Sequence, residues 1–203
     1  MLIGCIADDL TGATDVALML QSAGMRTLQA IGVPDEGAPG DADAVVVALK
    51  ARTIGAADAV AQSLAAHAWL LARGARQILF KYCSTFDSTD AGNIGPVADA
   101  LLDACGADFT VACPAFPTNK RTVYAGHLFV GQQLLSDSPM KDHPLTPMRD
   151  ANLVRVLGRQ TRRKVGLVPL ATVRLGAEAM REAFADLRRS GHAYAIVDAV
   201  ADA

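Results

Sequence analysis

The sequence lacks the loops by which nucleotide-binding proteins and serine hydrolases are most readily recognised. It contains no Gly-x-x-x-x-Gly-Lys-Ser/Thr phosphate loop, no Gly-x-Gly-x-x-Gly turn and no Gly-x-Ser-x-Gly elbow. Without such a loop, no segment of this chain has a known way to cradle the phosphates of a nucleotide. The absence argues against a nucleotide site of a known loop type here.

Aromatic residues and excess charge are scarce as well. Aromatics make up 5% of the 203 residues, and the net charge of −2 gives no attraction for nucleic acid or an anionic membrane. No apolar run approaches the roughly 20 residues that cross a bilayer, and the N-terminus has no signal-peptide pattern. The four cysteines and four histidines show neither Cys-x-x-Cys nor metal-ligand spacing. We therefore expect a cytoplasmic, disulfide-free protein with no metal site, no nucleic-acid partner and no membrane partner.

What the sequence does contain is a regular alternation of short apolar runs and amphipathic segments. The runs predict strands and the segments predict helices, separated by loops rich in glycine and proline such as Gly32–Asp41. This rhythm predicts an α/β fold, a three-layer α/β/α arrangement around a mainly parallel sheet. The predicted strands cover residues 2–7, 26–31, 44–49, 77–82 and 109–113, and the predicted helices 13–24, 56–73 and 93–105.

After Pro114 the rhythm changes. A loop to Arg121 precedes a short hairpin over 122–130 with its turn near Gly126, and residues 136–147 are too rich in Pro, Asp and Ser for a regular element. Asp150 is in a position to cap the next helix. Further elements are predicted at 150–157 (helix), 165–169 (strand), 176–190 (helix) and 193–197 (strand).

The segment Ile6–Asp15 carries the strongest functional signal. Asp8 and Asp9 are adjacent carboxylates at the carboxyl end of the first strand, where open α/β sheets bind their ligands. Thr11 and Gly12 follow at the start of a helix, whose free N–H groups favour anions. Two carboxylates in a crevice repel each other unless a cation or a substrate hydroxyl compensates for them. One of the pair can alternatively serve only as the helix cap.

Two further strands end in polar loops. Lys81 closes an otherwise apolar strand and needs an anionic partner, either structural (Asp8 or Asp87) or a substrate carboxylate. Arg52 and Arg121 follow other strands, and Arg121 can clamp a carboxylate in bidentate fashion. We expect all these segments to meet at one edge of one sheet. Hydroxyl and amide groups that suit a polyhydroxylated acid come from Ser84, Thr85, Ser88, Thr89, Asn93 and Asn119, although capping and turn formation are the alternative for each of them.

These motifs together resemble the four-carbon acid sugar kinase family. The resemblance rests on Ala7–Ala13 with Asp15, Lys81–Thr89, Cys113–Gly126 and Asp142–Met148, and it covers essentially the whole chain. Within the family, the Ser-Thr-Phe-Asp-Ser-Thr version of the second motif is more similar to the 3-oxo-tetronate kinases than to the threonate or erythronate kinases. Members of this family are about twice as long, with an N-terminal acid-sugar-binding domain and a C-terminal nucleotide-binding domain.

The resemblance implies that residues 1–203 are the acid-sugar-binding domain without the nucleotide-binding domain. It also implies ATP-dependent phosphorylation of the terminal hydroxyl of a 3-oxo-tetronate, with Mg²⁺ arriving with the nucleotide on the other domain, and a chain that is inactive alone. Homodimer formation is plausible for such an enzyme. Asp8 or Asp9, with a slight preference for Asp9, would accept the hydroxyl proton. The substrate-binding residues would be Thr11, Gly12, Arg52, Lys81, Ser84, Thr85, Asp87, Ser88, Asn93, Asn119 and Arg121.

Two other functions stay open at this point. The chain can be a stand-alone acid-sugar-binding module without catalysis. A haloacid-dehalogenase-like phosphatase also has paired aspartates after its first strand, but its motif is Asp-x-Asp-x-Thr, whereas Asp8 and Asp9 are adjacent.

Overall fold

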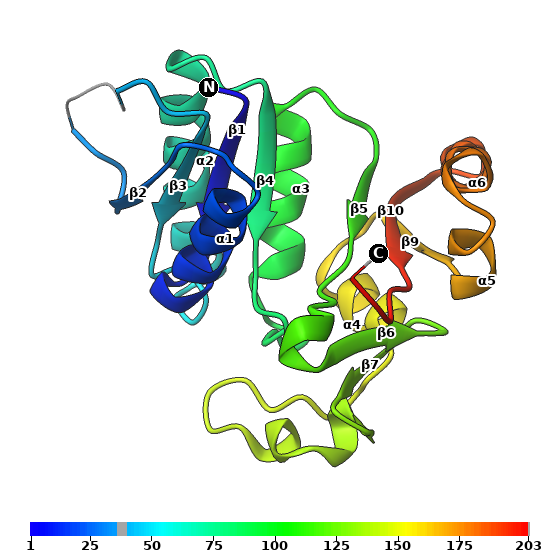
Figure 1. Ribbon diagram of the computed structural model, residues 1–203. Helices are drawn as coiled ribbons and strands as arrows, with labels where there is room; N and C mark the ends of the chain where they lie inside the picture. Colours follow the sequence, from blue (N-terminus) through cyan, green and yellow to red (C-terminus); the bar gives the residue numbers. More distant parts are fainter. Residues whose placement is uncertain (36–39, 203) are drawn as a thin grey trace. The chain divides into compact units, whose positions relative to one another are not determined.

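The computed structural model describes residues 1–35 and 40–202, so part of the expected loop at 32–41 lies outside the described residues. The chain divides into two compact units, Met1–Cys83 and a second unit that begins at Ser84. Each unit has its own parallel sheet (Figure 1). No helix in the described ranges is long and apolar enough to cross a membrane.

The first unit is a four-stranded, all-parallel sheet with the order β2-β3-β1-β4. Ala7, Ala48 and Lys81 lie side by side at the carboxyl ends of the three neighbouring strands. The elements are β1 (Ile3–Ala7), α1 (Leu10–Ser22), β2 (Thr27–Ile31), β3 (Ala44–Ala48), α2 (Ala56–Ala72) and β4 (Gln77–Lys81).

The two helices of this unit cover opposite faces of the sheet (Figure 1). Cys5 and Ala7 face α1 and form a core cluster with Ala13 of that helix. Gly4, which points to the other face, lies against Leu70 of α2, since a Cβ at Gly4 would be 3.0 Å from the Leu70 side chain. All five residues of β3 are buried, as expected for a strand covered on both faces. The expected three-layer α/β/α arrangement around a parallel sheet is confirmed.

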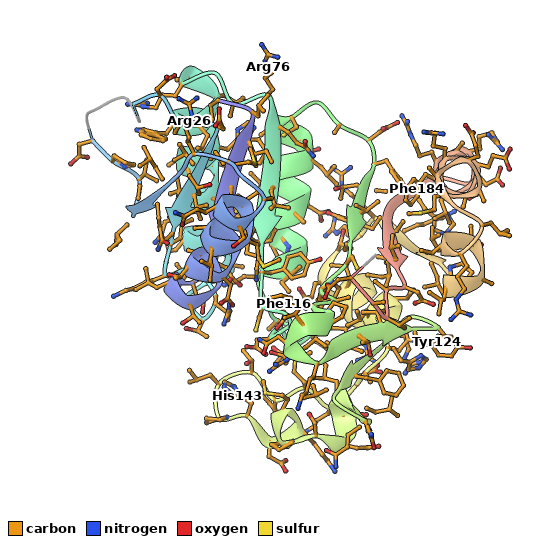
Figure 2. The ribbon with its side chains drawn as sticks, viewed as in Figure 1. Arg26, Arg76, Phe116, Tyr124, His143 and Phe184 are labelled. Carbon is orange, nitrogen blue, oxygen red and sulfur yellow. The ribbon has the colours of Figure 1, made fainter. Side chains whose placement is uncertain are left out.

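The second unit contains a three-stranded parallel sheet with the order β5-β10-β9 and a three-stranded antiparallel sheet with the order β6-β7-β8. Phe184 of its helix α6, labelled in Figure 2, packs with Phe109 at a ring-centroid distance of 5.8 Å. The parallel sheet and its helices are β5 (Thr110–Ala112), β9 (Lys164–Val168), β10 (His192–Val197), α3 (Ile94–Ala104), α4 (Leu153–Gln160), α5 (Leu170–Val173) and α6 (Ala177–Arg189). The remaining elements are β6 (Arg121–Tyr124), β7 (His127–Val130), β8 (Gln133–Leu134) and the 3₁₀ helices η1 (Pro117–Asn119), η2 (Leu135–Asp137) and η3 (Pro139–Asp142).

Three local expectations are wrong. β5 pairs with β10 rather than with a strand of the first sheet, so the described residues form two parallel sheets and not one. Residues 136–147 include η3 and most of η2, because Pro139 stands in the first turn of η3, where its missing N–H costs no hydrogen bond. Asn152, not Asp150, caps α4: its side chain accepts a hydrogen bond from the Arg155 N–H at 3.0 Å.

The hairpin predicted near Gly126 is confirmed, and its turn is tight. Ala125 and Gly126 connect β6 to β7, and both have positive φ, 49° and 72°. This is the backbone pattern of a type I′ turn, which favours asparagine or glycine at its first central position. An alanine there is strained by its Cβ.

We therefore expect Ala125→Gly to stabilise the second unit by about 0.5–1 kcal/mol, because the relief of strain exceeds the added entropy of the unfolded chain. Urea unfolding measures the effect. The control is Ala177→Gly at an exposed position of α6, where the same change should lower stability by up to about 1 kcal/mol. Equal losses in both variants would contradict the assigned strain.

Candidate functional site in the first unit

Asp9 connects β1 to α1 and is the N-cap of that helix. Its backbone is extended (φ −147°, ψ 167°), and its Oδ1 accepts a hydrogen bond from the Gly12 N–H at 2.8 Å. The expected cap role for one of the two aspartates is therefore confirmed for Asp9. Thr11 is exposed in the first turn of the same helix.

The guanidinium of Arg52 neutralises the negative charge of both aspartates. Its Nε and Nη2 donate to Asp8 Oδ2 and Oδ1 at 3.1 and 2.8 Å, and Nη2 also lies 2.9 Å from Asp9 Oδ1. The backbone strengthens the arrangement, since the N–H groups of Ala51 and Arg52 both donate to the Asp8 carbonyl. The register of β1 with β3 brings these segments together.

Burial shapes the titration of this pair. The side chain of Asp8 is 7% exposed and that of Arg52 18%. The pKa of Asp8 is raised above its ordinary value, because burial and the charge of Asp9 together outweigh the hydrogen bonds and charge of Arg52 and the charge of Lys81. The pKa of Arg52 is raised, because its hydrogen bond with Asp8 and the charge of that carboxylate outweigh the opposing effect of burial.

Lys81 brings a second cation to this sheet edge. Its Nζ donates to the Tyr82 carbonyl at 2.7 Å, and within the residues that the structure describes it forms no ion pair. Within the first unit, Asp8 is therefore not its structural partner. Gly12 lies between Lys81 and Asp9: a Cβ at this position would be 2.7 Å from Asp9 Oδ1 and 3.3 Å from Lys81 Nζ. Any larger residue at position 12 would therefore displace the Asp9 carboxylate from its present position.

The first unit thus brings together five of the predicted site residues, namely Asp8, Asp9, Gly12, Arg52 and Lys81. The guanidinium of Arg52 already binds two carboxylates of the chain and is matched in charge without a substrate, and its expected contact with a substrate stays a prediction. The ammonium of Lys81, by contrast, has a backbone carbonyl and no carboxylate as its partner in the described part of the chain.

The predicted hydroxyl-bearing residues Ser84, Thr85 and Ser88 belong to the second unit. Thr85 Oγ1 donates to Asp87 Oδ1 at 2.6 Å, and both residues are buried. Phe86 between them is fully buried with a φ of 53°, a strained conformation for a bulky residue. This segment is therefore held in a defined, locally strained form.

Gln160, which the sequence did not single out, holds the next part of this segment. Its Oε1 accepts from Ser88 Oγ at 3.1 Å and from the Gly95 N–H at 2.9 Å, and its Nε2 donates to the Thr89 carbonyl at 2.7 Å. Asn93, at the N-cap position of α3, is buried, but its side chain does not cap the helix. Ser88 thus has at least one structural role.

The remaining candidates follow β5. Asn119 is exposed, and its carbonyl accepts a hydrogen bond from the Arg121 guanidinium. The Nε of Arg121 is buried, with no hydrogen-bond partner in the described part of the chain. Because β5 lies in the second sheet, the expectation that Arg121 and the aspartates share one sheet edge is wrong.

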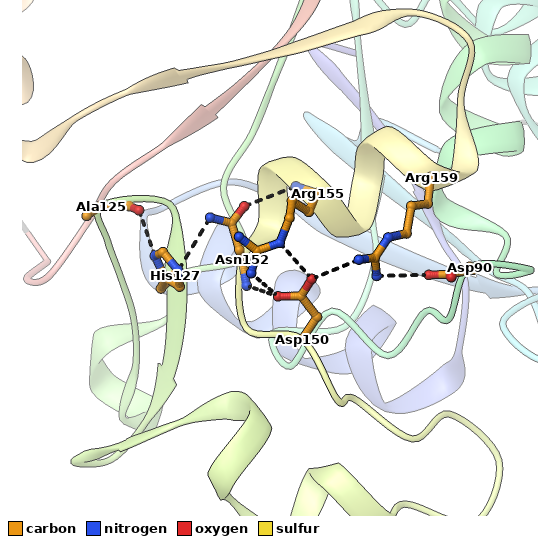
Figure 3. Close-up of polar contacts among 7 residues, drawn as sticks. All are labelled: Asp90, Ala125, His127, Asp150, Asn152, Arg155 and Arg159. Atoms are coloured by element: carbon orange, nitrogen blue, oxygen red, sulfur yellow. Dashed lines mark hydrogen bonds and ion pairs between the residues drawn. The ribbon is translucent and has the colours of Figure 1, made fainter.

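Asp90, Asp150, Asn152, Arg155 and Arg159 form a polar cluster around α4 that the sequence did not predict (Figure 3). Asp150 accepts from the Asn152 N–H and from Nε and Nη2 of Arg155, at 2.9, 3.0 and 2.7 Å. Arg159 lies 3.4 Å from both Asp150 and Asp90. The opposite charges balance within the cluster, which indicates a structural role at the start of α4.

Comparisons with known proteins identify the family of the chain. Residues 3–203 match the family model described as a sugar-binding N-terminal domain. A 3-oxo-tetronate kinase of Burkholderia multivorans is 68% identical over 201 residues, which are 99% of this chain and 47% of that protein. The corresponding kinase of Cupriavidus necator is 64% identical and covers all of this chain and 48% of its own length. The chain therefore spans about half the length of the curated relatives it matches.

Solved structures agree with these relatives. A Haemophilus influenzae protein superposes with a TM-score of 0.96 at 52% identity, over 98% of this chain and 48% of that one. A Bordetella bronchiseptica protein, described as a domain-swapped dimer with bound citrate, superposes with a TM-score of 0.77 at 27% identity, over 98% and 47%. With a family model matching nearly its whole length, the chain belongs to the family of sugar-binding N-terminal domains.

Proposed function

We propose that this chain is the sugar-acid-binding half of an ATP-dependent kinase that phosphorylates the terminal hydroxyl of 3-oxo-tetronate. The observation that carries the proposal is the cluster at the carboxyl end of β1, in a chain whose relatives at 52–68% identity are named 3-oxo-tetronate kinases. The cluster supplies a carboxylate for a hydroxyl and a cation for a carboxylate. A four-carbon sugar acid carries both of these groups.

Phosphoryl transfer needs positioning and charge neutralisation more than covalent help from the protein. In the proposed complex, the Lys81 ammonium attracts the carboxylate of the acid and an aspartate at the start of α1 holds the hydroxyl that attacks the γ-phosphate. Because Arg52 is already matched in charge, we assign it to the aspartates rather than to the substrate. Within the first unit, Thr11 and Gly12 are proposed to add backbone groups at the start of α1. The other predicted substrate-binding residues belong to the second unit and stay a prediction: Ser84, Thr85, Asp87, Ser88, Asn93, Asn119 and Arg121.

The aspartate pair does not fit a dedicated Mg²⁺ site. Three of its four carboxylate oxygens already face Arg52 or the Gly12 N–H, whereas Mg²⁺ demands an octahedral set of oxygens. ATP likewise has no phosphate loop in this sequence. We propose that the other half of such a kinase binds both the nucleotide and its metal ion.

The proposed setting of this kinase is the cytoplasm, in agreement with four cysteines that form no disulfide among the described residues. A homodimer is part of the proposal, and the dimeric Bordetella structure is a precedent for it.

A chimaera tests the proposed function. The chain replaces the matching half of the Burkholderia multivorans kinase, and ATP-dependent phosphorylation of 3-oxo-tetronate is measured by ADP release. We expect turnover within about tenfold of the parent kinase, because the two matching halves are 68% identical. A folded chimaera without turnover on any four-carbon sugar acid would contradict the kinase. If the chain alone nevertheless bound the acid, its function would be that of a stand-alone binding module and not that of half a kinase.

A further inference from the structure

We infer that the two adjacent aspartates have different tasks: Oδ2 of Asp9 accepts the proton of the attacking hydroxyl, while Asp8 and Arg52 are positioning residues that do not touch the substrate. This inference rests on the proposed function and deepens it. The two carboxylates are then not interchangeable: the substrate contacts Asp9, Arg52 contacts both aspartates, and Asp8 contacts Arg52.

The first argument is the number of free oxygens. Both oxygens of Asp8 accept hydrogen bonds from Arg52, Oδ2 from Nε and Oδ1 from Nη2. Oδ1 of Asp9 accepts from the Gly12 N–H and lies 2.9 Å from Arg52 Nη2. Among the described residues, Asp9 Oδ2 is the one carboxylate oxygen of the pair without a hydrogen-bond or ion-pair partner. It is therefore the oxygen that can receive a hydroxyl without breaking a bond of the protein.

The second argument is access. The Asp9 side chain is 27% exposed and that of Asp8 7%. Asp8 is also fixed through its backbone, whose N–H donates to the Lys81 carbonyl and whose carbonyl accepts from Ala51 and Arg52. A small acid can reach Asp9, whereas it would have to displace the Arg52 guanidinium to reach the carboxylate of Asp8.

A raised pKa would favour Asp8 as the proton acceptor if affinity for a proton alone decided the matter. Geometry decides otherwise, since a general base must lie within hydrogen-bond reach of the proton it takes. The oxygens of Asp8 are directed to Nε and Nη2 of one guanidinium at 3.1 and 2.8 Å. A planar fork of this kind holds a carboxylate in one orientation.

Arg52 is the link between the two carboxylates, because its Nη2 lies within 2.9 Å of an oxygen of each. Together with the Gly12 N–H, it holds Oδ1 of Asp9, and among the described residues Oδ2 has no hydrogen-bond or ion-pair partner. In the step itself, the hydroxyl O–H bond breaks as its proton passes to Asp9 Oδ2. The hydroxyl oxygen forms a bond to the γ-phosphorus of ATP, and the bond from that phosphorus to ADP breaks.

The kinase chimaera tests this division with the variants Asp9→Asn, Asp8→Asn, Arg52→Gln and, as a matched loss of an exposed carboxylate, Asp58→Asn. Asp9→Asn should lower kcat about 10³-fold with KM changed less than about threefold, since it removes the base and keeps the shape. Asp8→Asn and Arg52→Gln should lower kcat about 10- to 30-fold, the cost of a misplaced base. Asp58→Asn should match the wild type.

The pH profile of kcat separates positioning from mere structural damage. The kcat of the wild-type chimaera should fall at low pH, where a carboxylate base takes up a proton. Asp8→Asn leaves the Arg52 charge to Asp9 alone and should shift this limb to lower pH. Arg52→Gln leaves Asp9 beside an unbalanced carboxylate and should shift it to higher pH, and in Asp9→Asn the limb should disappear.

A second measurement needs no turnover and uses the 203-residue chain itself. With ¹³C-labelled aspartate carboxyls, addition of 3-oxo-tetronate should shift the signal of Asp9 and leave that of Asp8 in place. More than a tenth of wild-type kcat in Asp9→Asn, shifts of the pH limb in the same direction in Asp8→Asn and Arg52→Gln, or a ligand-induced shift confined to Asp8 would overturn the division of tasks. An inactive wild-type chimaera would instead overturn the proposed function.

Discussion

Replacing Asp198 by asparagine is expected to destabilise the second unit by about 3–5 kcal/mol, the largest effect on stability that we expect from a single conservative change. Asp198 follows β10 and is 1% exposed. Its carboxylate accepts from the N–H groups of Ala125, Gly126 and Leu170 at 2.7, 2.9 and 2.9 Å. One side chain thus joins the β6–β7 turn, the end of the parallel sheet and the start of α5.

An asparagine has one acceptor oxygen and turns an NH₂ group toward donors. The bonds to Gly126 and Leu170 are buried, so water cannot replace the lost acceptor there. Urea unfolding followed by circular dichroism measures the loss, with Asp202→Asn as the matched control. Asp202 accepts a hydrogen bond from Thr118 at an exposed site, and its replacement should change stability by less than about 0.5 kcal/mol. Similar small losses in both variants would show that Asp198 does not hold these segments together.

The second large effect concerns binding. Lys81→Met keeps the length of the side chain and removes its charge, and we expect it to weaken the affinity of the chain for 3-oxo-tetronate about 100-fold, or about 2.7 kcal/mol. The reason is that Lys81 ends β4 beside the aspartates and, within the described residues, forms no ion pair with them, whereas Arg52 is already paired with both. Isothermal titration calorimetry measures the change.

Lys164→Met is the control, since Lys164 is exposed on β9 of the second unit. It should leave the affinity unchanged within about twofold. The free energy of unfolding of Lys81→Met should stay within about 1 kcal/mol of that of the wild type. The reason is that the variant loses one hydrogen bond, to a backbone carbonyl. If folded Lys81→Met had the same affinity as the wild type, this result would show that another cation binds the carboxylate of the substrate.

The strand-to-loop transitions of the first unit could be predicted because each is a local pattern. An apolar run followed by Asp8 and Asp9, or ending in Lys81, places polar groups at the carboxyl end of a strand wherever that strand lies in the sheet. The helix cap at Asp9 is equally local, since its partner is three residues away.

The partners of these groups could not be predicted because they depend on which strands pair. Arg52 meets Asp8 only because β1 and β3 are neighbours in register. The role of Asp198 depends on backbone groups 28 to 73 residues away in sequence, and that of Gln160 on a serine 72 residues away. The separation into two parallel sheets has the same cause, since the length and composition of β5 do not reveal that it pairs with β10.

The most direct test of the central claim, that this chain is the half of a kinase that binds the sugar acid, is a calorimetric titration of the wild-type chain with 3-oxo-tetronate in the absence of nucleotide. We predict saturable binding at one site with a Kd of about 10 µM to 1 mM, the usual range for a metabolic substrate. The four-carbon ketose erythrulose, which has no carboxylate, should not bind detectably. A folded chain that gives no heat of binding with millimolar 3-oxo-tetronate, or that binds erythrulose equally well, would contradict the account.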